Sequence, residues 1–183
     1  LLKKTSLDKT QSEYLTAVRA SGNNLLNIIN DILDFSKLEA GKLNVEKIQF
    51  NIIEILNSLK VMFAQKAFDK QIKFEINIDE KTPSLIFGDP TRLTQILTNL
   101  INNAIKFTRI DGLISISILE ISEEVIEIKI QDNGVGMSEK EIQKIYSNDT
   151  KNSSIGTKGE KGTGLGLMLC LDFIKQNNGA ILI

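Results

Sequence analysis

The chain has 183 residues, 42% hydrophobic and 25% charged, which is enough to bury a sizeable core in one or two soluble domains. Its formal net charge of −1 gives no basic field for nucleic acid, so we expect no nucleic-acid partner. One cysteine and no histidine exclude a disulfide framework and a Cys/His zinc site.

Residues 10–43 are expected to form one long helix with a broad apolar face. Its heptad seam is Leu15, Val18, Gly22, Leu25, Ile29, Ile32 and Ser36, widened by Leu26, Ile28, Leu33 and Phe35. Asp8, Thr10 and Ser12 are candidate N-caps, and Gly41 is the expected stop. A lone helix cannot bury such a face, so we expect a helix from upstream of Leu1 and a second copy of the chain to cover it. The alternative is that the helix packs on the domain that follows.

The first half of the second domain is expected to contain strands and one helix. Residues 51–68 carry apolar side chains at helical spacing. Residues 71–79 alternate apolar and polar side chains, as a half-buried strand does. Shorter strands are expected at 45–50 and 84–87. These patterns place a domain boundary near residue 44 and predict domains over 1–44 and 45–183.

The second half of this domain begins with a helix from Pro90 to about Thr108, since proline is tolerated in a first turn. The other expected elements are strands at 113–120 and 124–131, a helix over 138–146 capped by Ser138, a polar loop over 147–162, a helix over Leu165–Gln176 and a strand starting at Ala180–Ile183. This order predicts an α+β fold, a two-layer α/β sandwich with a mixed, mostly antiparallel sheet and helices on one face.

The segment DNGVGM (132–137) places a carboxylate directly after an expected strand. Asp132 is an acceptor-only group, suited to the exocyclic amine of adenine and not to the carbonyl of guanine. Gly134 and Gly136 would let the backbone approach a base closely. Taken alone, the segment is more readily interpreted as an ordinary Asp-Asn-Gly turn.

The segment GTGLGL (162–167) opens an expected helix, whose N-terminal amides and dipole favour an anion. It is not a Walker loop, because GTKGEKGT (156–163) lacks the Gly-Lys-Thr order. It also lacks the strand that should directly precede a Rossmann fingerprint. The alternative is a loop that simply ends at a helix.

The segment NLINNAIKFT (99–108) places Asn99, Asn103 and Lys106 on one helix face. An amide oxygen is a hard ligand suited to Mg²⁺, and a lysine ammonium is a point charge for phosphate. A solvated helix face is the alternative for this segment alone. Together, the three segments favour a nucleotide site.

These three segments resemble the nucleotide-binding boxes of two-component sensor histidine kinases. NDILDFSKLEAGK (30–42) is similar to the end of that family's dimerisation helix, and FGDPTRLTQIL (87–97) also matches its pattern. The resemblance implies a Bergerat-type ATP-binding domain, a homodimer through residues 10–43 with the missing upstream helix, and a response-regulator receiver domain as partner. It also implies that residues 147–161 form a lid.

The resemblance assigns roles to particular residues. Asn103 would ligate Mg²⁺, Asn99 and Lys106 would support catalysis near the phosphates, and Asp132 would read the adenine amine. The remaining expected ATP contacts are Gly134, Gly136, Gly162, Thr163, Gly164, Leu165 and Gly166, with Lys158 or Lys161 at the γ-phosphate.

Three features depart from the family pattern. The phosphoacceptor histidine is absent and is expected just before Leu1, so no catalytic residue is expected within the fragment. The Phe-x-Pro-Phe segment that usually precedes the lid is replaced by YSND (146–149). The chain stops at Ile183, before the strands that complete the family's sheet. Since it also lacks an initiating methionine, we expect a fragment or a processed product.

The resemblance implies that the chain is a histidine kinase, which transfers the γ-phosphoryl group of ATP to a histidine outside this fragment and thence to a response-regulator aspartate. Two alternatives to this function follow from the residues. ATP-hydrolysing relatives such as gyrase and the heat-shock chaperone carry a glutamate where this chain has Asn99, and an amide cannot act as a general base. The second alternative is an inactive pseudo-kinase that serves as a dimerisation scaffold. No apolar run approaches the roughly 20 residues of a membrane helix, and no signal peptide opens the chain. We expect the cytoplasmic side of a membrane, with any anchor outside these residues.

Overall fold

The computed structural model of the chain describes Thr5 and residues 7–40, 46–79, 82–122, 125–147, 156–157 and 165–183. By its contacts the chain divides into two compact units, Leu1–Leu43 and Asn44–Ile183. No helix in the described part of the chain is long and apolar enough to cross a membrane.

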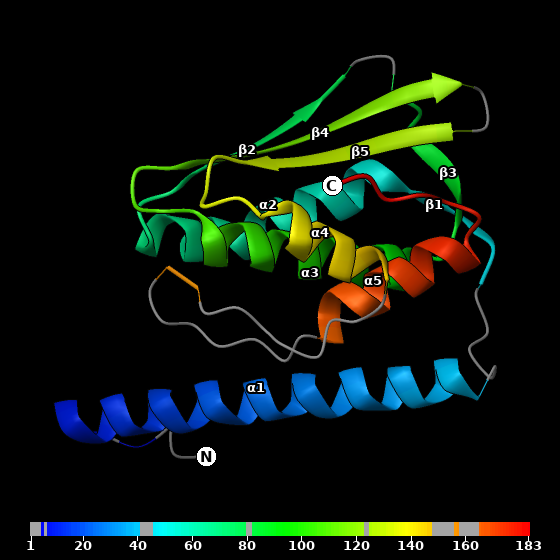
Figure 1. The fold of residues 1–183 in the computed structure, drawn as a ribbon. Helices are drawn as coiled ribbons and strands as arrows, with labels where there is room; N and C mark the ends of the chain where they lie inside the picture. Colours follow the sequence, from blue (N-terminus) through cyan, green and yellow to red (C-terminus); the bar gives the residue numbers. More distant parts are fainter. Residues whose placement is uncertain are drawn as a thin grey trace. The chain divides into compact units, whose positions relative to one another are not determined.

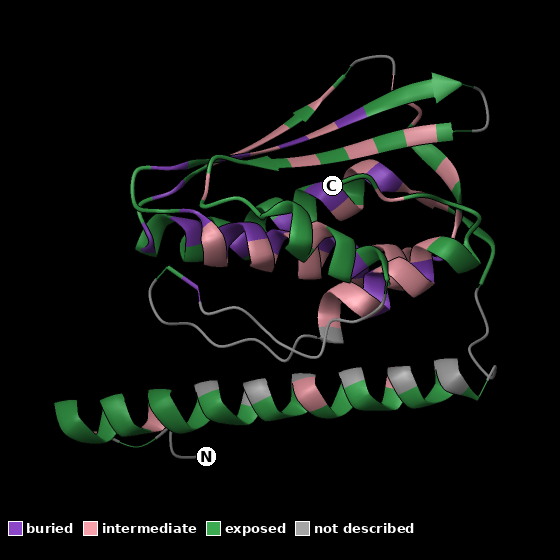
Figure 2. Cartoon of the chain, viewed as in Figure 1, coloured by how far each residue is buried: buried purple, intermediate pink, exposed green. Residues whose placement is uncertain are grey.

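Unit 1 contains one helix, α1 (Lys9–Glu39), which confirms the predicted helix over most of its length (Figure 1). Asp8 begins it: the Asp8 carboxylate accepts from the Gln11 amide at 2.8 Å, and the Gln11 side chain accepts from the Asp8 amide at 3.1 Å. The predicted stop at Gly41 lies outside the described residues. Exposed surface predominates along α1 (Figure 2). Its exposed apolar side chains are Tyr14, Val18, Leu25, Leu26, Ile29, Ile32 and Leu33.

The strands and helices of unit 2 follow the predicted order. Its elements are β1 (Ile48–Asn51), α2 (Ile52–Asp69), β2 (Lys73–Ile78), β3 (Leu85–Gly88), α3 (Pro90–Phe107), β4 (Leu113–Ser122), β5 (Val125–Asp132), α4 (Glu139–Tyr146) and α5 (Leu165–Gln176). Asn51 caps α2 through its side-chain oxygen, and Ser138 and Glu141 form a reciprocal capping box at α4.

The strands of unit 2 form two sheets. β1 and β3 pair antiparallel, and the second sheet has the order β2-β4-β5. β2 pairs parallel with β4, whereas β4 pairs antiparallel with β5. The described strands thus give the mixed, mostly antiparallel pairing that was predicted. Figure 1 shows the helices of unit 2 on one side of the three-stranded sheet.

The core of unit 2 lies between the three-stranded sheet and helices α2 and α3. Ile114, Ile116 and Ile118 alternate along β4 and are at most 1% exposed, because every second side chain of a strand points to one face. They meet an apolar stripe on each helix. The helix residues of this core are Ile52, Leu56, Leu59, Phe63 and Ala67 from α2 and Leu97, Ile101, Ala104 and Ile105 from α3.

Helix α3 is fixed at its start and along one side. Asp89 caps it by accepting from the Arg92 amide at 3.0 Å, directly before Pro90. The Arg92 guanidinium lies 4.8 Å from the centroid of the Phe173 ring, and the Cys170 thiol approaches the Ile96 carbonyl at 3.8 Å. Because Cys170 and Phe173 are buried residues of α5, these contacts hold α5 against α3.

The strand predicted to start at Ala180–Ile183 is wrong for this structure, which has no regular element there. The backbone groups of this segment bond to a side chain rather than to a strand. The Tyr146 hydroxyl donates to the Ile181 carbonyl at 3.4 Å and accepts from the Ile183 amide at 3.0 Å. The segment therefore runs beside the end of α4.

Candidate functional site

Helix α3 carries the three polar residues that the sequence analysis placed on one face. Asn99, Asn103 and Lys106 are each half-buried, and four- and three-residue spacing puts them on adjacent turns. The neighbouring Asn102 is engaged elsewhere, since its side-chain oxygen accepts from the Lys66 ammonium at 2.5 Å. The Lys106 ammonium lies 4.6 Å from the centroid of the Phe107 ring.

The DNGVGM segment reaches the C-terminal end of α3. The Val135 amide donates to the Phe107 carbonyl at 3.2 Å, which satisfies one of the carbonyls that a helix end leaves without a partner. A Cβ on Gly134 would lie 2.5 Å from the same carbonyl oxygen, so glycine is required by this close approach. The structure therefore brings the first glycine segment onto α3.

Asp132 is the last residue of β5, and its side chain is exposed. One carboxylate oxygen accepts from the Gly134 amide at 2.8 Å, which closes a tight turn. Gly136 has a φ of +68°, the left-handed region that favours glycine, and no described atom would meet a Cβ placed there. A planar group thus has space next to Gly136.

The second glycine segment also meets α3, at its middle. The Asn99 side-chain amide donates to the Gly166 carbonyl at 3.4 Å, and a Cβ on Gly166 would lie 3.3 Å from the Asn99 side chain. Leu165 begins α5 as predicted. The other predicted contacts in this part of the chain, Lys158, Lys161, Gly162, Thr163 and Gly164, lie outside the described residues, as does most of the predicted lid.

Two further residues hold the end of α3, and neither was among the predicted site residues. Lys70, which is only 5% exposed, donates through its ammonium to the Ile105 carbonyl at 2.7 Å and the Lys106 carbonyl at 2.9 Å. Thr157 donates to the Lys106 carbonyl through its amide and its hydroxyl, each at 3.1 Å. No sequence signal pointed to them, since each stands alone in a turn or a polar loop.

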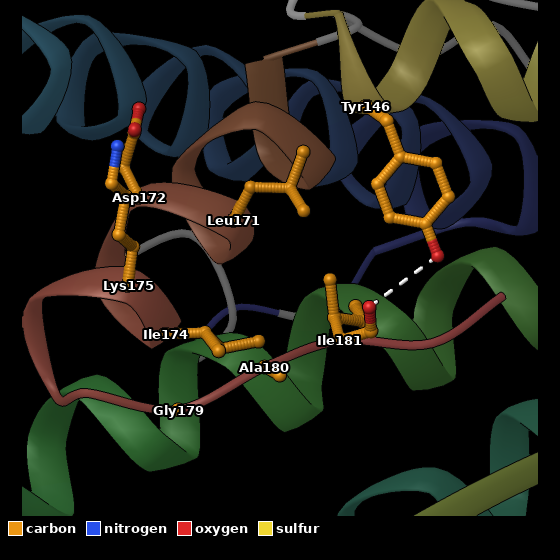
Figure 3. Close-up of a pocket in the computed structure, with 8 residues that line it drawn as sticks. All are labelled: Tyr146, Leu171, Asp172, Ile174, Lys175, Gly179, Ala180 and Ile181. Carbon is orange, nitrogen blue, oxygen red and sulfur yellow. Dashed lines mark hydrogen bonds between the residues drawn. The ribbon is translucent and has the colours of Figure 1, made fainter.

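A pocket lies between the end of α4, helix α5 and the tail of the chain, away from the predicted contacts (Figure 3). It is lined by Tyr146, Leu171, Asp172, Ile174, Lys175, Gly179, Ala180 and Ile181. Burial raises the pKa of the Asp172 carboxyl, and the nearby Lys175 charge lowers it by a smaller amount. None of the residues predicted for the nucleotide site lines this pocket.

The donor set on α3 suits a phosphate-bound divalent cation better than a cation held by protein alone. The described residues contain no group of three or more His, Cys, Asp or Glu side chains arranged for a metal. Mg²⁺ commonly uses only one or two protein oxygens and completes its shell with waters and substrate phosphates. The Asn103 side-chain oxygen could supply one such protein ligand.

The comparisons with known proteins decide the family. Residues 88–183 match the model of the histidine kinase-, DNA gyrase B- and HSP90-like ATPases, and residues 1–41 match the His Kinase A (phospho-acceptor) domain. The chain belongs to the histidine kinase-, DNA gyrase B- and HSP90-like ATPase family. The predicted resemblance and the predicted fold class are thereby confirmed.

Within this ATPase family, the chain is similar to sensor histidine kinases. It is 39% identical over 181 residues to the signal transduction histidine-protein kinase BarA of Escherichia coli K12, a match that covers 97% of this chain and 20% of BarA. It is also 39% identical over 184 residues to the sensor protein GacS of Pseudomonas syringae, covering 99% of this chain and 20% of GacS. The chain thus spans about a fifth of the length of these relatives.

Solved structures of histidine kinases share the fold. Full-length ShkA in complex with AMPPNP matches with a TM-score of 0.75 and 28% identity, covering 98% of this chain and 36% of ShkA. ThkA in complex with the response regulator protein TrrA matches with a TM-score of 0.65 and 23% identity, covering 97% of this chain and 48% of that one. Within the ATPase family, histidine kinases are therefore the proteins whose solved structures this chain resembles.

Proposed function

We propose that residues 45–183 bind ATP with Mg²⁺ and transfer the γ-phosphoryl group to a histidine outside these 183 residues. The observation that supports this most directly is the convergence of both glycine segments on α3. Gly166 lies against Asn99, and Gly134 lies against the Phe107 carbonyl. The helix that carries Asn99, Asn103 and Lys106 thus adjoins both segments.

In this proposal Asp132 accepts from the adenine amine through the carboxylate oxygen that does not bind the Gly134 amide. Gly134 and Gly136 line the base. Asn103 ligates Mg²⁺, which neutralises phosphate charge when bound. Lys106 and the segment Lys161–Gly166 contact the phosphates, with Lys158 a further γ-phosphate contact.

The reaction is phosphoryl transfer rather than hydrolysis. The bond from the γ-phosphorus to the bridging oxygen breaks, ADP leaves, a P–N bond forms to the imidazole, and the imidazole proton is released. A receiver-domain aspartate then takes the phosphoryl group from that histidine. Asn99 cannot activate water as a base, and its side-chain nitrogen instead donates to Gly166.

The dimer is part of the same proposal. The apolar side chains along α1 are exposed, and Val18, Leu25, Ile29 and Ile32 lie on the predicted seam. A second copy of the chain and an additional helix would cover them, and residues 1–44 would then serve as the dimerisation part. A cytoplasmic location follows from ATP as the phosphoryl donor.

Binding and transfer are tested separately. A fluorescence titration of the 183-residue chain with ATP is expected to show binding that Mg²⁺ strengthens. Asn103→Ala should abolish the gain from Mg²⁺, whereas Asn102→Ala, which removes the same side chain one residue earlier, should keep it. Transfer is measured with radiolabelled ATP and a separately produced domain that bears the acceptor histidine.

Two results would contradict the proposal in different ways. Steady ATPase turnover that Asn99→Ala abolishes would favour hydrolysis over transfer. Absence of ATP binding, with the chain still folded and dimeric by sedimentation, would favour the scaffold alternative.

A further inference from the structure

A buried lysine from the end of α2 lies against the C-terminal end of α3. Lys70 directly follows α2 and is only 5% exposed. Its ammonium donates to the Ile105 carbonyl at 2.7 Å and to the Lys106 carbonyl at 2.9 Å. Lysine is almost never buried to this extent unless its charge is paired or hydrogen-bonded. The charge of Lys70 therefore acts on the backbone at the end of α3.

The carbonyls at this end carry the negative pole of the helix. The peptide dipoles of a helix sum to about half a negative charge at its C-terminus, concentrated in the last turn. Val135 and Thr157 donate to the Phe107 and Lys106 carbonyls through neutral groups. Lys70 brings a positive charge to the same turn. It therefore offsets the negative pole, whereas a neutral donor only satisfies a carbonyl.

The residues proposed to hold Mg²⁺ and phosphate lie near this negative pole. Asn103 and Lys106 belong to the last two turns of α3, which ends at Phe107. Phosphate groups bound beside them would thus lie near a helix terminus of the unfavourable sign, since anions normally bind at the opposite, N-terminal end. A cation placed on the terminal carbonyls reduces this repulsion.

We infer that Lys70 is a positioning residue of the nucleotide site, whose buried ammonium holds the last turn of α3 and offsets its negative pole, so that phosphates can bind beside Asn103 and Lys106. The inference rests on the proposed ATP site and adds to it a residue that acts through the backbone of α3. Because an electrostatic effect grows with the charge of the ligand, loss of Lys70 should weaken ATP most, ADP less and adenosine least. A loss of packing alone would weaken all three equally.

The experiment compares Lys70→Met with Lys70→Gln in the 183-residue chain, with Mg²⁺ present and each ligand titrated by NMR. Methionine keeps an unbranched chain and removes the charge, so ATP should bind about 3- to 10-fold more weakly, while adenosine changes by less than about 2-fold. Glutamine keeps a neutral donor and should show the same order of losses. Lys66→Met is the matched control, which should leave ATP binding unchanged. The exposed Lys66 ammonium lies one turn earlier on α2 and donates to the Asn102 side chain.

The outcomes separate the inference from the proposed function. Unchanged ATP affinity in Lys70→Met would overturn the inference alone, as would equal weakening of the three ligands or the same losses in Lys66→Met. Wild-type ATP affinity in Lys70→Gln would also overturn it, because a hydrogen bond without a charge would then suffice. If the methionine variant does not fold, Lys70→Gln decides through the same comparison of ligands. A wild-type chain that binds no ATP would overturn the proposed function and this inference with it.

Discussion

The two glycine segments that flank α3 are held by different kinds of bond. The first, DNGVGM, is fastened to α3 by a bond between backbone groups. Asn133 bonds to Leu113 in both directions, at 3.2 Å through its amide and 2.8 Å through its side-chain oxygen, and Val135 bonds to Phe107. In addition, Gly134 has no room for a side chain.

The second segment, GTGLGL, is fastened to α3 through a side chain in the part of the chain that the structure describes. The Asn99 side-chain amide donates to the Gly166 carbonyl at 3.4 Å, near the limit for a hydrogen bond. This contact does not exclude a methyl group by close backbone approach. In the proposed ATP site, a preformed base side and an adaptable phosphate side would meet at one helix, which would suit chemistry at the phosphates.

The largest effect is expected from Asp132→Asn, which tests the preformed side. Asparagine can keep its oxygen on the Gly134 amide, but its NH₂ group then faces the adenine amine, donor against donor. Loss of a hydrogen bond to a charged group should weaken ATP binding by about 10- to 100-fold. A fluorescence titration measures this, with the melting temperature of the nucleotide-free chain as a check of folding. Unchanged affinity would contradict the base assignment.

A pair of glycine substitutions compares the two sides directly. Gly134→Ala places a Cβ 2.5 Å from a backbone oxygen and should lower the free energy of unfolding by about 1–3 kcal/mol. Gly166→Ala meets only the side chain of Asn99 at 3.3 Å, which can move, and alanine is favoured over glycine within a helix, so we expect a change of less than about 1 kcal/mol. Urea denaturation of both variants gives the two values. Equal losses would remove the distinction between the segments.

The smallest expected effect is on the pH dependence of stability, to which a carboxyl on α4 and a carboxyl on α5 should contribute with opposite signs. Hydrogen bonds from Ser138 lower the pKa of Glu141 on α4, whereas burial raises the pKa of Asp172 on α5. Ionised Glu141 adds to the free energy of unfolding above its ordinary pKa of about 4.3. This gain is lost as pH falls through the lowered pKa of the folded state. For Asp172 the sign is reversed: the ionised carboxylate weakens the fold, and this cost disappears as pH falls through the raised pKa towards about 3.9.

Unfolding curves of Glu141→Gln and Asp172→Asn between pH 7 and 3 test these signs. Asp172→Asn should be slightly more stable than wild type at pH 7, and the difference should shrink on acidification. Glu141→Gln should be slightly less stable at pH 7, with a difference that also shrinks. Both effects should be small because Glu141 is exposed and Asp172 is only half-buried. An Asp172→Asn chain less stable than wild type at pH 7 would contradict the burial effect.

The sequence predicted the elements of unit 2 well because each carries a local signal. The apolar alternation in 113–120 and the Ser138 cap are of this kind, and so is the start of α3 at Pro90. The parallel pairing of β2 with β4 has no local signal, since it depends on which strands meet in space. At Ala180–Ile183, where a strand was predicted, the Ile181 carbonyl and the Ile183 amide bond to the Tyr146 hydroxyl, a contact that no local pattern indicates.

The residues of the candidate site likewise differ in whether the sequence carries a local signal for them. Asn99, Asn103, Asp132 and the glycines stood out because unusual residue types recur at short spacing. Lys70 and Thr157 did not, since their roles depend on carbonyls far along the chain. A hydrogen bond from a side chain to a distant backbone leaves no periodic trace in a sequence.

The way α3 ends bears on the order of folding. Its start is closed locally by Asp89 and Pro90, but its last carbonyls accept from Lys70, Val135 and Thr157, which are all distant in sequence. Contacts across long stretches of chain form slowly, because loop-closure entropy opposes them. The body of α3 can thus assemble early with the core, while its last turn is completed late. In native-state hydrogen exchange, the donors at that turn should open by local unfolding while the buried strand β4 stays closed.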